Sequence, residues 1–279
     1  MVEPDRGKYL YCIIHRSEPR EFTNRGMGDG GDLVYTVGAG DLAVVVSDSP
    51  EIEYERSRRN MLTHTLVLEE VVQEFTALPI RFGTVAPAHA SIATELLDRR
   101  HDEFAGLLDE MEGRVELGLK AIWYEDTIFA EIVDENPPIR ELRDSLKGKS
   151  TAETHFGRMR LGEMVQDAMF AKRDGDARAI LARLEPLAVE TRENPLFSDR
   201  MVLNAAFLVE RENEPAFDRA VDELDAEMGR RLILKYVGPT PLYNFVSINV
   251  TWDQPGPTAV DPAHSRCESA VAENLREQR

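Results

Sequence analysis

Side chains able to do covalent or metal chemistry are few and scattered in this 279-residue chain. Cys12 and Cys267 lie near opposite ends, which predicts neither a disulfide framework nor a metal site. No two of the six histidines have the spacing of a zinc-binding helix, and His64 is expected to be a half-buried polar residue of a helix. Cys12 and His15, three residues apart in an expected strand, point to opposite faces and cannot form a catalytic dyad. The sequence therefore indicates no enzyme, no cofactor and no metal.

A glycine-rich stretch, "GMGDGGD" at residues 26–32, has the composition of a phosphate-binding loop. The segment after it is predicted to be a strand, so its backbone amides lack the helix N-terminus that a phosphate cradle needs. We therefore expect a flexible loop here.

The stretch "TALPIRFGTVAP", residues 76–87, places one arginine inside an apolar segment with a proline near each end. We expect a strand over Leu78–Val85, in which Ile80 and Phe82 share one face and Arg81 lies on the other. One interpretation is that Arg81 is solvated and paired with an acidic neighbour. The other is that it forms a fixed fork for a partner's carboxylate or carbonyl groups.

Charge limits the partners that this chain can attract. Its net charge of −18 repels nucleic acid and anionic membranes, and no basic run offsets it. Only six of the 33 basic residues are lysines, and an acidic, lysine-poor surface is typical of proteins from salt-rich cytosol, with an acidic mesophilic protein as the alternative. No apolar run is long enough to span a membrane and no leader follows the start, so we expect a soluble, cytoplasmic protein.

Hydrophobic periodicity predicts two successive sets of strands and helices. The first set comprises a strand at 9–15, a hairpin turning at 38–41, a helix at 57–75, the strand at 78–85 and a helix at 91–111. The second comprises a strand at 114–124, a break at Pro137–Pro138, two helices at 154–172 and 177–192 separated by "RDGD", a strand starting at 201, a helix at 215–228 and a strand ending near 239.

An internal similarity supports a division into two domains. "HTLVLEEVVQEFTALPIRFGTVAP" and "AFDRAVDELDAEMGRRLILKYVGPTP" share one layout of amphipathic helix, break and apolar strand, and Arg81–Phe82 matches Lys235–Tyr236. This is the skeleton of ferredoxin-like units. A true duplication stays open, because helix followed by strand is a common pairing. The predicted fold class is α+β: two ferredoxin-like domains, 1–112 and 113–252, each a mainly antiparallel sheet backed by helices, with a mobile acidic tail at 253–279.

The motifs "LPIRFGT", preceded by "HTLVLEEVV", and "LKYVGPTPLYNFV" resemble signature segments of the gas vesicle protein L and gas vesicle protein F family. The resemblance spans the chain from "YLYCIIH" to "YNFV" and differs from the family pattern at Thr240 and Leu242. The acidic composition, length and tail look more like protein L of salt-loving cells.

The resemblance implies an accessory protein that acts in gas vesicle assembly and is not an enzyme. It implies binding to the major shell protein, to other accessory gas vesicle proteins, or to both, in the cytoplasm and in association with gas vesicles. The rival hypothesis is an RNA-binding module, because a ferredoxin-like sheet is also an RNA platform; the charge argues against it. The candidate partner-binding residues are Arg81, Phe82, Gly83, Lys235, Tyr236, Tyr243, Asn244 and Phe245.

Overall fold

A computed structural model describes residues 6–27, 31–50, 53–87, 91–250 and 252. The expected mobile tail at 253–279 lies outside these residues, as does part of the glycine-rich loop. The chain divides into two compact units: unit 1 comprises 1–117, 208–212 and 237–279, and unit 2 comprises 118–207 and 213–236.

The first sheet belongs to unit 1 and has the strand order β2-β3-β4-β1-β5, with β6 also pairing with β1. Neighbouring strands of this sheet pair antiparallel throughout the described residues. The expected hairpin is confirmed, because β3 and β4 are joined by a tight turn in which Gly40 has a φ of +63°. The strands are β1 Gly7–His15, β2 Glu21–Phe22, β3 Val34–Ala39, β4 Leu42–Ser49, β5 Ala77–Pro79 and β6 Val85–Ala86.

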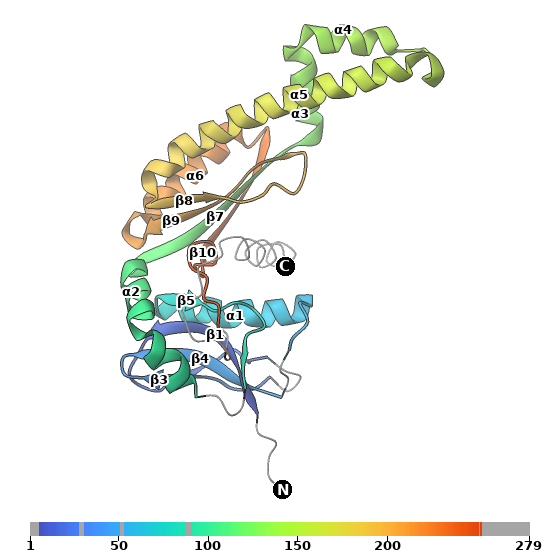
Figure 1. Cartoon of the computed structure of the whole chain (residues 1–279). Coiled ribbons are helices and arrows are strands. Elements are labelled where there is room, and N and C mark those ends of the chain that lie inside the picture. The colour runs from blue at the N-terminus through green and yellow to red at the C-terminus, as the bar shows by residue number, and fades with distance from the viewer. Residues whose placement is uncertain (1–5, 28–30, 51–52, 88–90, 251, 253–279) are drawn as a thin grey trace. The chain divides into compact units, whose positions relative to one another are not determined.

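Helix α1, Arg58–Glu74, lies along this sheet and contacts β1 and β5 (Figure 1). Ser57 caps it by accepting a hydrogen bond from the Asn60 amide, and its apolar stripe is buried in the unit 1 core. The helix expected at 91–111 is interrupted: a π-helical segment at Ile92–Leu97 and a short 3-10 turn precede α2, His101–Met111. The sequence therefore predicted both helical segments, at 57–75 and 91–111, but not the interruption within the second.

The second sheet has the order β10-β7-β9-β8. In chain order its strands stand fourth, first, third, second, and β3-β4-β1-β5 of the first sheet shows the same order read from the other edge. The sequence predicts an α+β fold with two sheets backed by helices, and this fold class is confirmed. The strands are β7 Arg114–Trp123, β8 Glu190–Glu193, β9 Met201–Glu210 and β10 Leu232–Thr240.

Helix α6, Glu214–Met228, begins with a proline in its first turn as expected and packs on unit 2 strands through Phe217. The Phe217 ring lies 5.0 Å from that of Phe207 on β9 and 6.0 Å from that of Tyr236 on β10, centroid to centroid. The spacing of apolar residues in this segment predicted both the helix and its buried face.

The region between β7 and β8 departs most from prediction. Pro137–Pro138 does not simply interrupt the chain, since both prolines occupy the first turn of α4, Pro137–Leu146, which follows α3, Glu125–Glu135. The two helices expected around "RDGD" are one 34-residue helix, α5, Thr151–Leu184.

Tertiary anchoring explains why α5 continues through Gly175, which costs a helix about 1 kcal/mol relative to alanine. Next to it, the Asp176 carboxylate accepts hydrogen bonds from Trp123 Nε1 at 2.8 Å and from Arg231 Nη2 at 3.1 Å. Local propensity favours a break here, and contacts distant in sequence override it.

Candidate interaction surfaces

Arg81 lies in a turn, and the expectation of one strand from Leu78 to Val85 is wrong. Strand β5 ends at Pro79, and the chain turns before β6 begins at Val85. The Arg81 carbonyl accepts bonds from the Thr84 amide at 3.2 Å and the Thr84 hydroxyl at 2.7 Å. Gly83 has a φ of +86°, a conformation that favours glycine. Strand alternation therefore does not set the direction of Arg81; the turn does.

The Arg81 side chain is half-buried, and its guanidinium has no hydrogen-bond or ion-pair partner among the residues that the structure describes. A methyl group added at Gly83 would meet no atom within 4 Å, so the turn is open to space on that side. A planar cation on a backbone held by hydrogen bonds can pair bidentately with a carboxylate.

Phe82 points the other way, into the unit 1 core, where only 5% of it is exposed. Its ring meets that of His64 edge to face at 5.5 Å. His64 is fully buried rather than half-buried, because α1 presents it to β1. Tyr9 Oη accepts a bond from the Gly83 amide at 3.0 Å and lies 3.0 Å from His64 Nδ1, so hydrogen bonds link the turn to α1. Phe82 in this position supports the turn that displays Arg81.

Burial alone lowers the pKa of His64 to about 3. The ring stacks on Tyr11, and His64 Nε2 has no hydrogen-bond partner within the described part of the chain. A neutral ring with Nδ1 as the acceptor from Tyr9 fits this environment. The only sign of this buried environment in the sequence is a histidine on the apolar side of a predicted helix.

The chain just after the second signature segment lies beside the first segment, although about 165 residues separate them. The Arg81 amide donates to the Ile248 carbonyl at 3.2 Å, and the Ile248 amide donates to the Pro79 carbonyl at 3.4 Å. Trp252 Nε1 donates to the Val85 carbonyl at 3.2 Å. The end of the second motif shares the unit 1 core with the first, since Tyr243 and Phe82 belong to one buried cluster.

Tyr243, Asn244 and Phe245 are buried in this segment, each less than a tenth exposed. The carboxylate of Glu116, itself 1% exposed, accepts the Asn244 amide at 2.9 Å and Asn244 Nδ2 at 2.6 Å. Thr240 Oγ1 also lies 3.4 Å from this carboxylate. These three candidate residues shape the segment from inside, and a partner cannot reach them without a rearrangement.

Lys235 and Tyr236 lie on β10 in unit 2, apart from the other candidates in the chain's division, and both are half-buried. Tyr236 Oη donates to Asp218 at 2.6 Å, and burial together with this acidic neighbour raises the pKa of Tyr236. The structure thus groups Arg81 to Gly83 with Tyr243 to Phe245 but does not add the matching pair on β10.

Unit 2 also carries a surface that sequence reasoning missed. Phe156 on α5 is 84% exposed and Met159 is 53% exposed, and Phe170 and Phe197 are about half exposed. Phe156 and Met159, three residues apart, are neighbours on the surface of α5, and exposed apolar groups that lie together mark sites of interaction. The available signal was weak, because the apolar residues of α5 do not follow one helical stripe.

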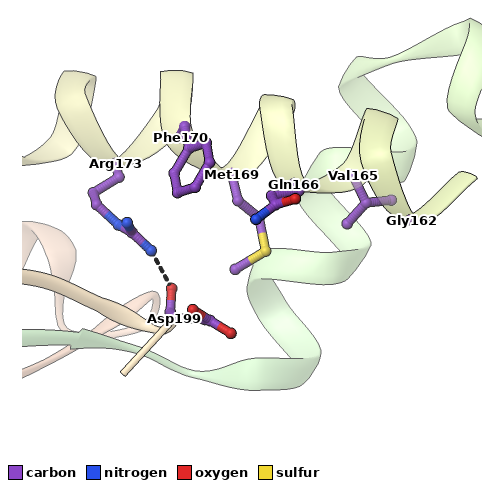
Figure 2. Close-up of a pocket in the computed structure, with 7 residues that line it drawn as sticks. All are labelled: Gly162, Val165, Gln166, Met169, Phe170, Arg173 and Asp199. Atoms are coloured by element: carbon purple, nitrogen blue, oxygen red, sulfur yellow. Dashed lines mark hydrogen bonds between the residues drawn. The ribbon is translucent and has the colours of Figure 1, made fainter. Parts of the chain in front are cut away.

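A pocket of about 230 Å³ lies beside Phe170 on α5 (Figure 2). Figure 2 shows Met169 pointing from α5 toward the segment with Asp199, whose carbonyl accepts Arg173 Nη2 at 2.5 Å. The Arg173 guanidinium lies 5.2 Å from the Phe170 ring centroid. Such a pocket suits an apolar side chain. Its lining residues are Gly162, Val165, Gln166, Met169, Phe170, Arg173 and Asp199.

Groups for metal or covalent chemistry do not gather in the described residues. No cluster of three or more His, Cys, Asp or Glu side chains in these ranges could hold a metal ion. Cys12 is fully buried in β1, and burial raises the pKa of its thiol. Across the same ranges, no helix is both long and apolar enough to cross a membrane.

Two antiparallel sheets with helices define an α+β protein. A family model described as "Gas vesicle synthesis protein GvpL/GvpF" matches residues 7–247. The chain belongs to this family.

Relatives and a solved structure agree. Gas vesicle protein F of Nostoc sp. is 28% identical over 245 residues, 87% of this chain and 99% of the relative. The Streptomyces sp. protein F is 31% identical, covering 85% of this chain and 98% of the relative. The crystal structure of GvpF from Anabaena sp. matches with a TM-score of 0.75 and 27% identity, over 88% of this chain and all of the other. These names describe gas vesicle proteins and not enzymes.

The expected closer likeness to protein L is not supported by these matches. Gas vesicle protein L1 of Halobacterium salinarum is 24% identical over 254 residues, below both protein F sequences.

Proposed function

We propose that this chain is an accessory protein of gas vesicle assembly that binds the major shell protein, other accessory gas vesicle proteins, or both. It acts in the cytoplasm, in association with growing gas vesicles. Family membership and the relatives' names support a role in gas vesicle formation. A partner that covers the apolar surface of a free shell subunit would keep that subunit from aggregating, by mass action.

The observation that carries the binding proposal is Arg81. Its backbone is tied to Ile248 and Thr84, whereas its guanidinium has no partner in the described ranges. The backbone of this arginine is already ordered, and its planar guanidinium loses little conformational entropy per hydrogen bond that it forms with a carboxylate. Phe82 anchors the Arg81 turn in the core, and Gly83 allows the backbone conformation of that turn.

The test is a binding titration of wild type, Arg81→Ala and Arg81→Lys against the shell protein and each accessory protein. We expect Arg81→Ala to weaken capture by about 2–5 kcal/mol if the pair is buried at the interface and by much less at its rim. Arg81→Lys should recover only part, because an ammonium cannot form the fork.

The control is Arg99→Ala, which removes an exposed arginine of unit 1 that the binding proposal does not use. Melting curves run alongside separate binding from folding. Unchanged capture of every partner by Arg81→Ala would end the proposal, and an unfolded variant would make Arg81 an internal brace instead.

RNA binding is the alternative function for a ferredoxin-like sheet. The net charge of −18 opposes it. A filter-binding titration with single-stranded RNA at low salt would reveal saturable binding if this alternative held, and we expect none.

We further infer that the chain is organised as two α+β domains, 1–112 and 113–252, followed by an acidic tail. Residues 7–86 supply every strand of the first sheet and residues 114–240 every strand of the second among the described ranges. Limited proteolysis tests this organisation: stable fragments should end near residue 113 and near residue 253.

A further inference from the structure

The end of the α4–α5 hairpin, residues 139–160, is a well-defined structure that the proposed function leaves unused; we refer to it as the hairpin tip. Helix α4 folds back along the N-terminal half of α5 (Figure 1). Ser150 and Glu153 form a reciprocal cap at the start of α5. A methyl group added at Gly157 would come within 2.6 Å of Leu146, so the two helices pack closely there. Side chains on the outside of the tip are thus presented by a firm backbone.

The hairpin tip is positively charged in a strongly negative chain. It holds six basic residues against three acidic ones, a net charge of +3, which leaves −21 for the rest of the chain. The acidic three are Glu141, Asp144 and Glu153, and the basic six are Arg140, Arg143, Lys147, Lys149, Arg158 and Arg160.

Two of the three carboxylates are already engaged within the tip. Asp144 pairs with Arg143 at 2.9 Å and with Lys147 at 2.8 Å. Glu153 accepts bonds from the Ser150 amide and hydroxyl. Their partners hold the pKa of both carboxyls below the ordinary values, so both are ionised at neutral pH.

Three cations of the hairpin tip are not neutralised by a carboxylate. In the described ranges Lys149, Arg158 and Arg160 have no acidic partner, and Arg158 Nε only donates to the Thr154 hydroxyl at 3.0 Å. A surface cation without a counter-charge is available to a carboxylate from outside.

The exposed apolar groups share one face of α5 with a cation. Phe156, Met159 and Arg160 stand at helical positions i, i+3 and i+4, which are neighbours on the helix surface. Phe156 is the most exposed large apolar residue of the described chain, at 84%. Arginine beside an aromatic group and a methionine is the composition of binding hot spots.

We propose that the hairpin tip docks an acidic segment of another protein, one that carries apolar side chains between its carboxylates. Carboxylates pair with Arg158, Arg160 and Lys149, and an apolar side chain covers Phe156 and Met159. The surface is distinct from Arg81, and the proposal does not depend on binding there.

Charge selects this occupant over other anionic ones. Nucleic acid or an anionic bilayer would extend beyond the tip over a chain that carries −21, and a second copy would bring a net −18 of its own. A short acidic segment of a partner meets only the positive tip.

The first experiment maps the occupant. Met159 is replaced by p-benzoyl-phenylalanine in the full chain, in cells that form gas vesicles, and the photo-crosslinked peptide is sequenced. We expect a segment of another protein with excess Asp and Glu and interspersed apolar residues. No crosslink, or one to nucleic acid, to a second copy or to a basic segment, overturns the proposal.

The second experiment titrates a synthetic copy of that peptide with the full chain. Phe156→Ser and the double variant Arg158→Glu/Arg160→Glu should each bind at least tenfold more weakly than wild type. The control Arg219→Glu, at an exposed position of α6, should bind the peptide with an affinity within twofold of wild type. Equal affinity of all four chains would contradict the proposal.

Arg81→Ala is included in the titration and should bind the peptide as wild type does. Its effect on shell and accessory protein capture is measured separately, so either proposal can fail while the other stands. Phe156 and both arginines are exposed, so the variants should keep the wild-type fold, and circular dichroism checks this.

Discussion

Four strands of each sheet share one order, but the first two of these strands are connected differently in the two sheets. In the first sheet, the described residues between β1 and β3 contain only the short strand β2. In the second, α3, α4 and α5 lie between β7 and β8. The helix before the last strand, α1 or α6, packs on its sheet in both. The strands and the helix common to both halves, which we call the common frame, are mostly buried, whereas the inserted helices expose apolar side chains.

This difference teaches where each half can meet a partner. Around the first sheet the apolar signature residues are buried, whereas Arg81 is half-buried and its guanidinium has no partner in the described ranges. In the second half, Phe156, Met159 and Phe170 are exposed on the inserted helices, and Phe197 is exposed between β8 and β9. A helical insertion is tolerated because it connects strands whose pairing it does not alter.

Low salt is expected to have the largest effect, and it should affect both halves at once. The chain has a net charge of −18, so its acidic groups repel one another when salt does not screen them. This repulsion reaches about 10 Å at 0.1 M salt but only about 3 Å at 1 M. We expect loss of secondary structure on dilution from 2 M to 0.1 M KCl, followed by far-ultraviolet circular dichroism. Identical spectra and melting temperatures at both concentrations would show that the chain is not salt-adapted.

Two phenylalanines should separate the buried frame from the exposed insertion. Phe82→Ala should cost about 3–5 kcal/mol of unfolding free energy, because the cavity beside His64 and Tyr9 cannot close fully. Phe156→Ala should change it by less than about 0.5 kcal/mol. Urea unfolding in high salt measures both. Similar losses for the two variants would mean that the tip is also packed in solution.

Removing the amide of Asn244 should cost about 1.5–3 kcal/mol, since the buried Glu116 carboxylate loses a charged hydrogen bond. The measurement is the unfolding midpoint of Asn244→Ala. Asn213→Ala, at an exposed position before α6 without a side-chain cap bond, is the control and should stay near wild type. A stable Asn244→Ala chain would mean that the signature segment is held by its apolar residues alone.

Mild acid should destabilise the first half through His64. Its pKa is lowered to about 3 in the folded chain from an ordinary value of 6.5. As pH falls from 6.5 toward 3, the unfolded chain binds a proton that the folded chain refuses, so stability is present above pH 6.5 and is lost below it. Between pH 7 and pH 5 the loss is about 2 kcal/mol.

His64→Gln isolates this effect, because glutamine can accept the Tyr9 hydroxyl bond but does not titrate. The pH dependence of the wild-type unfolding free energy should be steeper than that of His64→Gln by that amount. Parallel curves for the two chains would show that water reaches the ring.

Much of the frame could be predicted because it depends on local periodicity. The stripe Met61, Thr65, Leu68 identified α1, and Phe217, Val221, Leu224 identified α6 with its buried face. The family resemblance then identified the two segments that lie together in unit 1, although no local pattern shows that they touch.

Positions where local and distant forces disagree could not be predicted. "RDGD" has the composition of a break, but Trp123 and Arg231 hold Asp176 and α5 runs on. The stretch around Arg81 has strand composition, but the Gly83 turn and hydrogen bonds to Ile248 and Tyr9 end β5 at Pro79.

The sequence by itself determined the α+β class, the amphipathic helices of both halves, the family and the prominence of Arg81, because composition, periodicity and motif are properties of neighbours in the chain. Only the tertiary structure decided which candidates are buried, that Glu116 holds Asn244, and that Phe156 stays exposed on a positive tip. Burial and pairing depend on residues tens to hundreds of positions apart, and those distances are set by the packing of the whole chain.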